Sequence, residues 1–248
     1  ASAVHAAARR LAEAGVPDPL VDAELLAGHV LDARRGEVQA AVIRGDAVTD
    51  DAAVALDALV TRRSAREPLQ HITGTAPFRH LELAVGPGVF VPRPETETVV
   101  QYAIDALLAS PLPAPIGIDL GTGSGAIALA MATEVPHSRV FAAELSPEAY
   151  PWAVRNTAGV ANLTLVQEDL AEAFHELDGT ASVVISNPPY VPDAAIPRDP
   201  EVRLFDPSMA LYGGEDGLDV VRALSVRALD LLHPGGLLVI EHGELQGE

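Results

Sequence analysis

Apolar residues recur at helical spacing through the first part of the chain. Between Ser2 and about Arg66, alanine and leucine repeat every three or four positions, which is the period of an amphipathic helix. Breaks interrupt this pattern at Gly15-Val-Pro17, Arg35-Gly36 and Gly45-Asp46. The pattern predicts a small bundle of helices as a first domain, which we place at residues 1–76.

A change of period follows the helical stretch. From Phe78 to Pro94, apolar and polar residues alternate around Gly86-Pro-Gly88, as they do in two short paired strands. We interpret residues 77–93 as a hairpin that connects the helical domain to a second domain at residues 94–248.

The second domain alternates helices with short apolar strands. Its first helix begins at Pro94, with Glu95 and Glu97 in the first turn, and the proline-rich segment SPLPAPIG follows that helix. Strands are predicted at Ile116–Leu120, Arg139–Ala143, Leu163–Gln167, Ser182–Ser186 and Gly236–Ile240, and helices are predicted to begin near Gly125, Pro147, Leu170 and Gly217. This alternation predicts an α/β fold with a doubly wound parallel sheet that binds its ligand at the carboxyl ends of the strands.

Composition narrows the classes of function. With 35 acidic and 16 basic residues, the chain has a formal net charge of −19, which disfavours extended contact with phosphate backbones or anionic lipid. The absence of cysteine excludes disulfides and thiolate chemistry, and the eight histidines show no ligand spacing, so no metal is expected. No apolar run reaches the roughly 18 to 20 residues of a membrane span, and we expect a cytoplasmic protein.

The segment IDLGTGSGAIALAMA joins a strand end to a helix start through a glycine loop. Glycines allow a tight turn and let a ligand lie against backbone N–H groups. Candidate cofactor-binding residues are Asp119, Gly121, Thr122, Gly123, Ser124 and Gly125. Because Gly121, Gly123 and Ala126 also satisfy the loose dinucleotide fingerprint, a nicotinamide-dependent oxidoreductase stays open, as does a purely structural turn.

Two acidic residues follow the next two strands. Glu144 lies about 20 residues beyond the glycine loop, where a carboxylate accepts hydrogen bonds from both hydroxyls of a ribose. A solvated charge at a helix start is the alternative for Glu144. Asp169, with Leu170 beside it, holds the equivalent position after the third strand and is expected to face an adenine amino group, although a helix N-cap explains Asp169 nearly as well.

The fourth strand ends in the motif Asn187-Pro-Pro-Tyr190. Pro188 and Pro189 have no N–H to donate, so the motif is rich in acceptors. The Asn187 side-chain oxygen and the Pro188 carbonyl are suited to the two hydrogens of a planar –NH₂ group, with Tyr190 packed on its flat face. We therefore predict an amide or an aromatic amine as the bound group, against the alternative of a capped strand end with a proline turn.

These motifs resemble those of a known family. DLGTGSG with Glu144 resembles the S-adenosylmethionine site of class I methyltransferases, and Asn187-Pro-Pro-Tyr190 resembles the signature of those that methylate planar nitrogens. The stretches REPLQHITG, FVPRPETE, DPSMALYGGEDGLD and LLVIEHGELQGE extend the resemblance, over essentially the whole chain, to the release factor glutamine methyltransferases of the PrmC/HemK family.

This resemblance implies a methyl donor, a methyl acceptor and the residues that bind them. The donor is S-adenosylmethionine, which leaves as S-adenosylhomocysteine, and the acceptor is the glutamine side-chain amide in the Gly-Gly-Gln loop of class 1 peptide release factors. Asn187, Pro188 and Tyr190 are implied as catalytic, Pro189 joins them in binding substrate, and Asn187 borders the cofactor. The helical domain and hairpin are implied to hold the release factor, and FVPRP to line the cofactor pocket. We expect a monomer without direct nucleic acid contact.

Two features depart from the family pattern. Glutamate stands at Glu144 where the family usually carries aspartate; the longer arm keeps its acceptors, so ribose binding is expected to persist. The sequence ends at Glu248, just after the fifth strand, where relatives continue through a further helix and two strands. We expect either a truncated chain, which leaves a sheet edge open, or a tail missing from the sequence.

Several interpretations stay open at this point. A DNA or RNA adenine-N6 or guanine-N2 methyltransferase has the same need for two acceptors, although the acidic charge disfavours it. A non-catalytic binding protein on a methyltransferase scaffold is another alternative. The cluster Arg62, Arg63 and Arg66 is interpreted either as favourable charge at a helix C-terminus or as a grip on an acidic or RNA-bearing partner.

Overall fold

The computed structural model describes residues 2–246, which form two compact units. The first unit contains the residues up to Gly74 together with Pro197–Phe205, and the second contains Thr75–Ile196 and the residues from Asp206 onward. Among the described helices, none combines the length and apolar composition that a membrane span requires.

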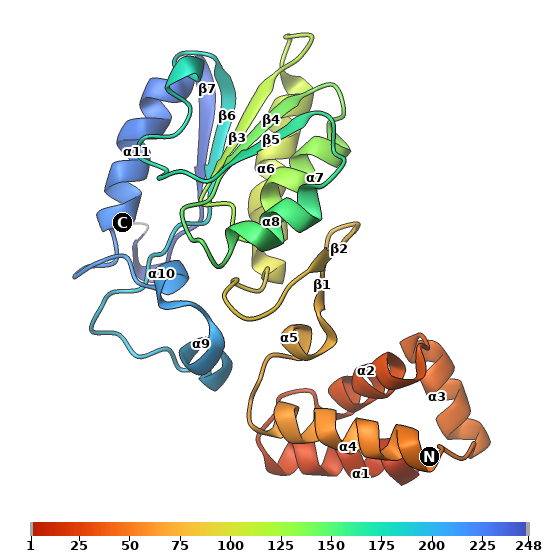
Figure 1. Cartoon of the computed structure of the whole chain (residues 1–248). Coiled ribbons are helices and arrows are strands. Elements are labelled where there is room, and N and C mark those ends of the chain that lie inside the picture. The colour runs from red at the N-terminus through yellow and green to blue at the C-terminus, as the bar shows by residue number, and fades with distance from the viewer. Residues whose placement is uncertain (1, 247–248) are drawn as a thin grey trace. The chain divides into compact units, whose positions relative to one another are not determined.

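The first unit is a bundle of helices, as its sequence predicts. It comprises α1 (Ser2–Glu13), α2 (Pro19–Leu31), α3 (Arg35–Arg44), α4 (Asp50–Ser64), α5 (Leu69–Thr73) and the separate α9 (Pro200–Phe205) (Figure 1). Leu11, Leu26 and Val60 are fully buried in its core. Arg35-Gly36, expected to break the helical pattern, instead opens α3, because the Glu37 carboxylate accepts from the Arg34 N–H at 2.7 Å and caps the helix.

Arg63 in the last turn of α4 and Arg66 just after that helix bind acidic residues of the same unit. Arg63 is buried, and it donates from Nε to Asp22 at 2.6 Å and from Nη2 to Glu201 of α9 at 2.8 Å. Arg66 donates to the same Glu201 oxygen, also at 2.8 Å. These arginines therefore tie α9 to the bundle, a role that neither interpretation from the sequence anticipated.

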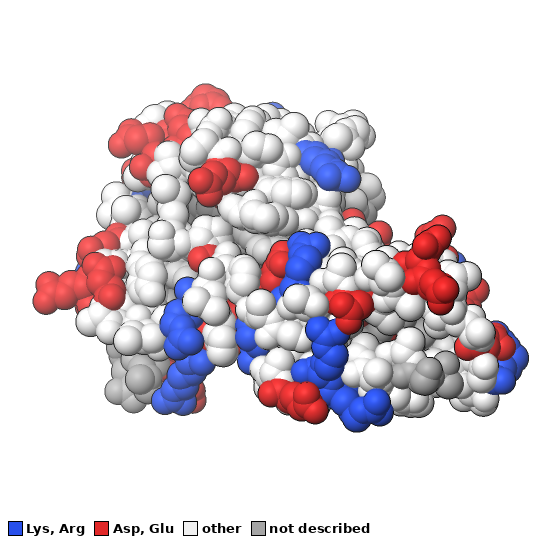
Figure 2. Space-filling model, turned by 60° about the horizontal axis from the view of Figure 1, so that its bottom comes forward, with Lys and Arg blue, Asp and Glu red and all other residues white. Residues whose placement is uncertain are grey.

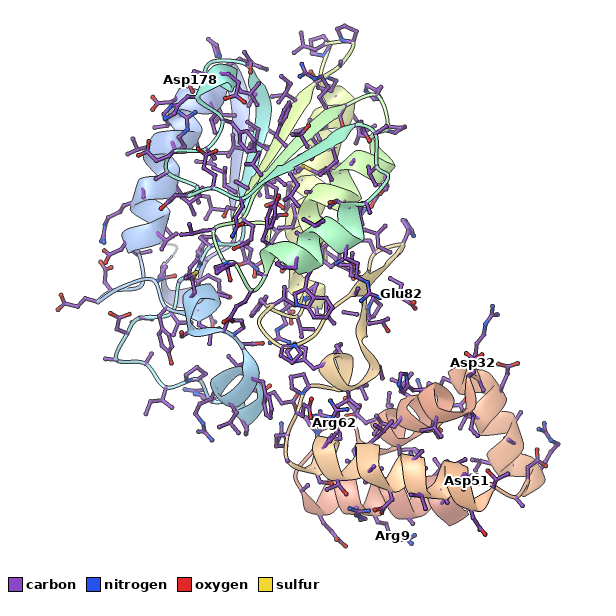
Figure 3. The ribbon with its side chains drawn as sticks, in the orientation of Figure 1. Arg9, Asp32, Asp51, Arg62, Glu82 and Asp178 are labelled. Carbon is purple, nitrogen blue, oxygen red and sulfur yellow. The ribbon has the colours of Figure 1, made fainter. Side chains whose placement is uncertain are left out.

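Replacing Arg63 with methionine is expected to destabilise the protein by about 3 kcal/mol, because Asp22 loses its buried partner. Burial already raises the pKa of Asp22, against the opposing effect of Arg63. Arg62→Met is the matched control: the Arg62 side chain, labelled in Figure 3, is 45% exposed and pairs with Glu67, so its loss should cost less than about 1 kcal/mol. Urea unfolding measures both variants, and equal losses would contradict the assignment.

The second unit is built on a five-stranded parallel sheet in the order β5-β4-β3-β6-β7. The strands are β3 (Ile116–Leu120), β4 (Arg139–Ala143), β5 (Leu163–Val166), β6 (Ala181–Ser186) and β7 (Leu232–Ile240). The helices are α6 (Pro94–Ala109), α7 (Ala126–Glu134), α8 (Tyr150–Thr157), α10 (Ser208–Leu211) and α11 (Asp219–Leu231), with a short 3₁₀ turn η2 (Glu244–Gln246). The prediction of an α/β fold with five parallel strands is confirmed, with β7 beginning earlier than expected.

Alternate strand residues pack against helices on opposite faces of this sheet. Figure 1 shows α6, α7 and α8 on one side and α11 on the other. In β6, Val183 and Ile185 join the core shared with α6 and α7, whereas Val184 joins the core shared with α11. In β3, Asp119 lies on the α7 side, where its Oδ2 accepts from the Ala128 N–H at 3.1 Å. The fold thus encloses one acidic side chain between the sheet and a helix.

The hairpin turn lies earlier than predicted. Strands β1 (Thr75–Phe78) and β2 (Leu81–Ala84) pair antiparallel, which puts the turn at Arg79-His80. Arg79 has a φ of +53° there, and its guanidinium binds Glu134 of α7. Gly86-Pro-Gly88 belongs to a separate turn that the Val89 N–H closes onto the Gly86 carbonyl. The prediction of a turn at Gly86-Pro-Gly88 is therefore wrong, because the strands pair through Phe78 and Leu81, on either side of Arg79-His80.

No helix begins near Leu170, so that prediction is also wrong. The connection from β5 to β6 consists of turns and a 3₁₀ helix, η1 (His175–Leu177). Phe174 has a φ of +64°, which ends any continuous helix before η1. Its ring is buried 5.5 Å from that of Phe141 on the α11 side of the sheet. Tertiary burial of this aromatic residue overrides the local helical pattern.

Candidate active site

The candidate residues lie at one edge of the sheet in the second unit. Parallel strands bring their carboxyl ends to the same edge. The glycine loop follows β3, Glu144 follows β4, Asn187 follows β6 and Glu241 follows β7. Strand β3 lies between β4 and β6, so the order of strands reverses beside the glycine loop, as it does at ligand sites of doubly wound sheets (Figure 1).

The N–H groups of the glycine loop are bound mainly by residues at the end of β4. The Gly121 and Thr122 N–H groups donate to the Ala143 carbonyl at 2.9 and 3.0 Å, and the Gly125 N–H donates to the Thr122 carbonyl at 2.9 Å. The Gly123 N–H donates to a carboxylate oxygen of Glu144 at 2.7 Å. These N–H groups are therefore engaged within the protein, and the carboxylates around the loop become the main candidates for ligand contact.

Asp119 is a fully buried carboxylate with one unpartnered oxygen. Its Oδ2 accepts from the Thr122 hydroxyl at 2.5 Å and from the Ala128 N–H at 3.1 Å. Its Oδ1 is buried, and no described residue donates to it. Burial raises the pKa of Asp119 to about 7 against these hydrogen bonds, and the nearby Glu144 charge adds to the rise. A positively charged ligand group would relieve both effects.

Glu144 lies beside this acid without a basic partner among the described residues. Its two oxygens accept from the Gly123 N–H at 2.7 Å and the Ser146 N–H at 2.8 Å. Burial raises the pKa of Glu144, and these backbone hydrogen bonds oppose the rise. A carboxylate has about four acceptor sites, so Glu144 keeps capacity for hydroxyl groups of a ligand. Together with Asp119, it fits a cofactor that carries both positive charge and a diol.

Asp169 lies in a turn that follows β5. It is exposed beyond β5, and its Oδ1 accepts from the Ala171 N–H at 2.9 Å, which caps a local turn instead of a helix. Neighbouring Leu170 is half-buried. A contact of these two residues with an adenine ring stays a prediction.

Asn187 presents an acceptor at the end of β6. It is half-buried, and its Nδ2 donates to Thr96 Oγ1 at 3.3 Å, whereas no described residue donates to its Oδ1. The buried Pro188 follows, and within the described chain its carbonyl likewise receives no hydrogen bond. Two consecutive residues thus offer acceptors without an internal donor, as binding of a planar –NH₂ group requires.

Comparison with known proteins decides the family. The family model described as the PrmC N-terminal domain matches residues 2–74, and the one described as the methyltransferase small domain matches residues 102–210. A release factor glutamine methyltransferase of Streptomyces coelicolor is 53% identical over 245 residues, which cover 98% of this chain and 85% of that relative. The chain belongs to the release factor glutamine methyltransferase family.

Other relatives of this methyltransferase include the release factor glutamine methyltransferase of Bifidobacterium longum, which is 44% identical over 257 residues that cover 99% of this chain and 87% of the relative. A 4-amino-L-phenylalanine/4-methylamino-L-phenylalanine methyltransferase of Streptomyces pristinaespiralis is 40% identical over 190 residues, covering 75% of this chain and 65% of the relative. The first relative is named for a release factor glutamine and the second for an amino-substituted phenylalanine.

In this methyltransferase, a glycine-rich loop supports the backbone of the Asn187-Pro-Pro-Tyr190 motif. A Cβ at Gly217 would stand 2.3 Å from the Tyr190 carbonyl oxygen, and a Cβ at Gly213 would stand 2.6 Å from the Pro189 carbonyl oxygen. Gln246 Nε2 donates to the Tyr190 carbonyl at 3.0 Å. Burial raises the pKa of the Tyr190 phenol, which keeps it neutral. The stretch DPSMALYGGEDGLD, whose only signal in the sequence was its resemblance to the family, thus fixes the backbone position of Pro189 and Tyr190.

Replacing Gly217 with alanine is expected to lower turnover about 10- to 100-fold, because the new Cβ displaces the Tyr190 backbone from its position in the site. Gly235→Ala is the matched control. Both glycines have positive φ, +78° and +87°, so both variants carry strain of about 1–2 kcal/mol, but nothing lies within 4 Å of a Cβ at Gly235. Methyl transfer rates and melting temperatures separate the two effects. Equal losses of turnover would contradict a role for the Gly217 contact.

Two polar residues that contact Asn187 were not selected from the sequence. Thr96 lies in the first turn of α6, a segment that the sequence identified only as a helix start, and Glu241 lies within the stretch LLVIEHGELQGE, which was quoted only for its family resemblance. The signal for Glu241 is its position directly after a strand, which Glu144 and Asn187 share. Within residues 2–246, no group of three or more metal-ligating side chains gathers in a way that holds a metal ion.

Proposed function

We propose that this methyltransferase transfers a methyl group from S-adenosylmethionine to the side-chain amide nitrogen of the glutamine in the Gly-Gly-Gln loop of class 1 peptide release factors. The observation that carries the proposal is the pair of unfilled acceptors, Asn187 Oδ1 and the Pro188 carbonyl, at the strand end next to the glycine loop. The names of the relatives support the same acceptor.

The residues around the glycine loop suit the proposed cofactor. Asp119 Oδ1 is a buried acceptor without an internal donor and suits a cationic amino group, while Glu144 suits the ribose hydroxyls. When bound, S-adenosylmethionine supplies a methyl group that its sulfonium already activates. One Glu144 oxygen also accepts from the Gly123 N–H, which ties this carboxylate to the glycine loop.

The chain's own contribution to the reaction is positioning. An amide nitrogen is a weak nucleophile because its lone pair is delocalised, and alignment of the reacting atoms is worth roughly 7–11 kcal/mol of barrier. Hydrogen bonds from the amide hydrogens to Asn187 and Pro188 strengthen as the nitrogen gains positive charge, so they stabilise the transition state more than the bound substrate. Formation of the nitrogen–carbon bond would break the carbon–sulfur bond of the donor, and the amide nitrogen would then lose one proton to water.

Each domain of the chain has its own proposed role. The helical domain at residues 1–76 and the hairpin region at residues 77–93 are proposed to hold the release factor, and the domain at residues 94–248 to carry out methyl transfer. A monomer in the cytoplasm is the proposed working form. The segment FVPRP is proposed to line the cofactor pocket, and its Arg93 is held by Asp206 at 2.6 Å.

Nucleic acid is not the favoured acceptor. The formal charge of −19 opposes phosphate binding, and acidic side chains lie beside the basic ones on the face drawn in Figure 2. An aromatic amine is a second candidate acceptor, because the Streptomyces pristinaespiralis relative is named for that chemistry and the same two acceptors suit its –NH₂ group.

Incubation with labelled S-adenosylmethionine tests the proposal. Separate reactions contain a class 1 release factor, its Gln→Ala version in the Gly-Gly-Gln loop, duplex DNA, and 4-amino-L-phenylalanine. We expect label on the release factor alone, and none on the Gln→Ala version. Label on the DNA or on the free aromatic amine, without label on the release factor, would overturn the proposal.

A further inference from the structure

A short hydrogen-bond chain lies behind Asn187 in the second unit. The Thr96 hydroxyl donates to Glu241 Oε2 at 2.8 Å, and Asn187 Nδ2 donates to the same hydroxyl oxygen at 3.3 Å. The Asn187 amide also hydrogen-bonds to the Glu241 carboxylate. The two groups that contact Asn187, the Thr96 hydroxyl oxygen and the Glu241 carboxylate, are therefore both acceptors.

The proton count makes this network directional. An ionised carboxylate accepts hydrogen bonds but donates none, and a threonine hydroxyl has a single proton. Because Thr96 gives that proton to Glu241, its oxygen has only lone pairs to offer to Asn187. The Asn187 group that faces Thr96 must then be –NH₂. The Asn187 oxygen is consequently directed away from this pair, and no described donor binds it there.

The fold holds the three side chains in register. Ser186 of β6 pairs with Ile240 of β7, and the Glu241 N–H donates to the Ser186 carbonyl at 3.0 Å, so the residues that follow the two strands are neighbours. Thr96 is only 4% exposed in the first turn of α6. Burial is the largest cause that raises the pKa of Glu241, while its hydrogen bonds from Thr96 and Asn187 act in the opposite direction and favour the ionised acceptor.

We propose that Thr96 and Glu241 are positioning residues that fix the amide orientation of Asn187, so that this methyltransferase presents an oxygen to its acceptor and thereby selects a glutamine amide over a glutamate carboxylate. The inference rests on the proposed function, because it assumes that Asn187 receives the substrate amide. A flipped Asn187 would present –NH₂, which repels the substrate –NH₂ group and suits a carboxylate instead.

Glu241→Gln tests the orientation of the Asn187 amide. Glutamine has nearly the same shape as glutamate, but its side chain can donate a hydrogen bond as well as accept one. A glutamine –NH₂ group can donate to Thr96, whose hydroxyl is then free to donate to the Asn187 oxygen. We expect kcat for the release factor to fall roughly 10- to 100-fold, as when other orienting partners are lost, with little change in the Kd of S-adenosylmethionine. We also expect a release factor carrying Gln→Glu in the Gly-Gly-Gln loop to inhibit this variant at least several-fold better than the wild type.

Matched variants separate orientation from charge and from folding. Glu95→Gln removes a neighbouring, exposed carboxylate and should leave both kcat and the inhibition unchanged. Thr96→Val should lower kcat, whereas Thr96→Ser, which restores the hydroxyl, should recover it. If Glu241→Gln keeps wild-type kcat and wild-type discrimination against the Gln→Glu factor, the inference is overturned. If the wild-type enzyme itself does not methylate the release factor, the proposed function fails instead.

Discussion

Replacing Asn187 with alanine is expected to lower the rate of methyl transfer by about 10²–10³, as loss of a single preorganised hydrogen-bonding group does in other enzymes. The variant removes the Oδ1 acceptor and leaves the Pro188 carbonyl as the only acceptor of the pair. The fold should tolerate the change, because Asn187 is half-buried and, among the described residues, its amide hydrogen-bonds only to Thr96 and Glu241.

Three measurements check this result. Single-turnover transfer from labelled S-adenosylmethionine to the release factor gives the rate, titration calorimetry gives the cofactor Kd, and thermal unfolding gives the stability. We expect the Kd and the melting temperature to stay near the wild-type values while the rate falls. Near-normal turnover in the Asn187→Ala variant would remove this residue from the mechanism.

Asp119→Asn is expected to stabilise the ligand-free protein at pH 8 while it weakens cofactor binding. An aspartate that titrates near 4 when unfolded, and at about 7 in the fold, binds its proton more tightly in the fold. The free energy of unfolding of the wild type therefore falls as pH rises from about 4 to about 7. Asparagine carries no such charge, so its advantage over the wild type should grow by about 2–3 kcal/mol between pH 5 and pH 8.

The same substitution should weaken S-adenosylmethionine binding about 10- to 100-fold at pH 8, because a hydrogen bond between charged groups is lost. Asp206→Asn is the contrasting control: Asp206 is also buried, but it pairs with Arg93 at 2.6 Å, so its neutralisation should destabilise the protein. Denaturant unfolding at both pH values and calorimetry with the cofactor measure these effects. A wild-type stability that does not change between pH 5 and pH 8 would contradict the raised pKa of Asp119.

Local patterns were sufficient to predict most of the second unit. The strand β3 was placed at its observed bounds, because a short apolar run followed by a glycine loop has few alternative structures. The positions of Glu144 and Asn187 directly after strands followed from the same reasoning, since residues at parallel strand ends share one edge. The prediction near Leu170 was wrong because the burial of Phe174 is a long-range effect that periodicity does not contain.

Pairing between distant segments accounts for what periodicity missed. Thr96 and Glu241 are 145 residues apart in the chain and meet through a hydrogen bond, and Arg63 meets Glu201 across 138 residues. Hydrogen-bond direction depends on which donors and acceptors the folded chain brings together, and no local pattern encodes it.

Residue order and tertiary structure determine different parts of the chemistry of the site. Residue order alone determined that Asn187-Pro-Pro-Tyr190 is rich in acceptors, because proline has no N–H. Tertiary structure decided which atom of the Asn187 amide is available, because the Thr96 hydroxyl and the Glu241 carboxylate occupy its –NH₂ side. It also decided that Asp119 is a buried acid with a raised pKa, because only packing between β3 and α7 removes its carboxylate from water.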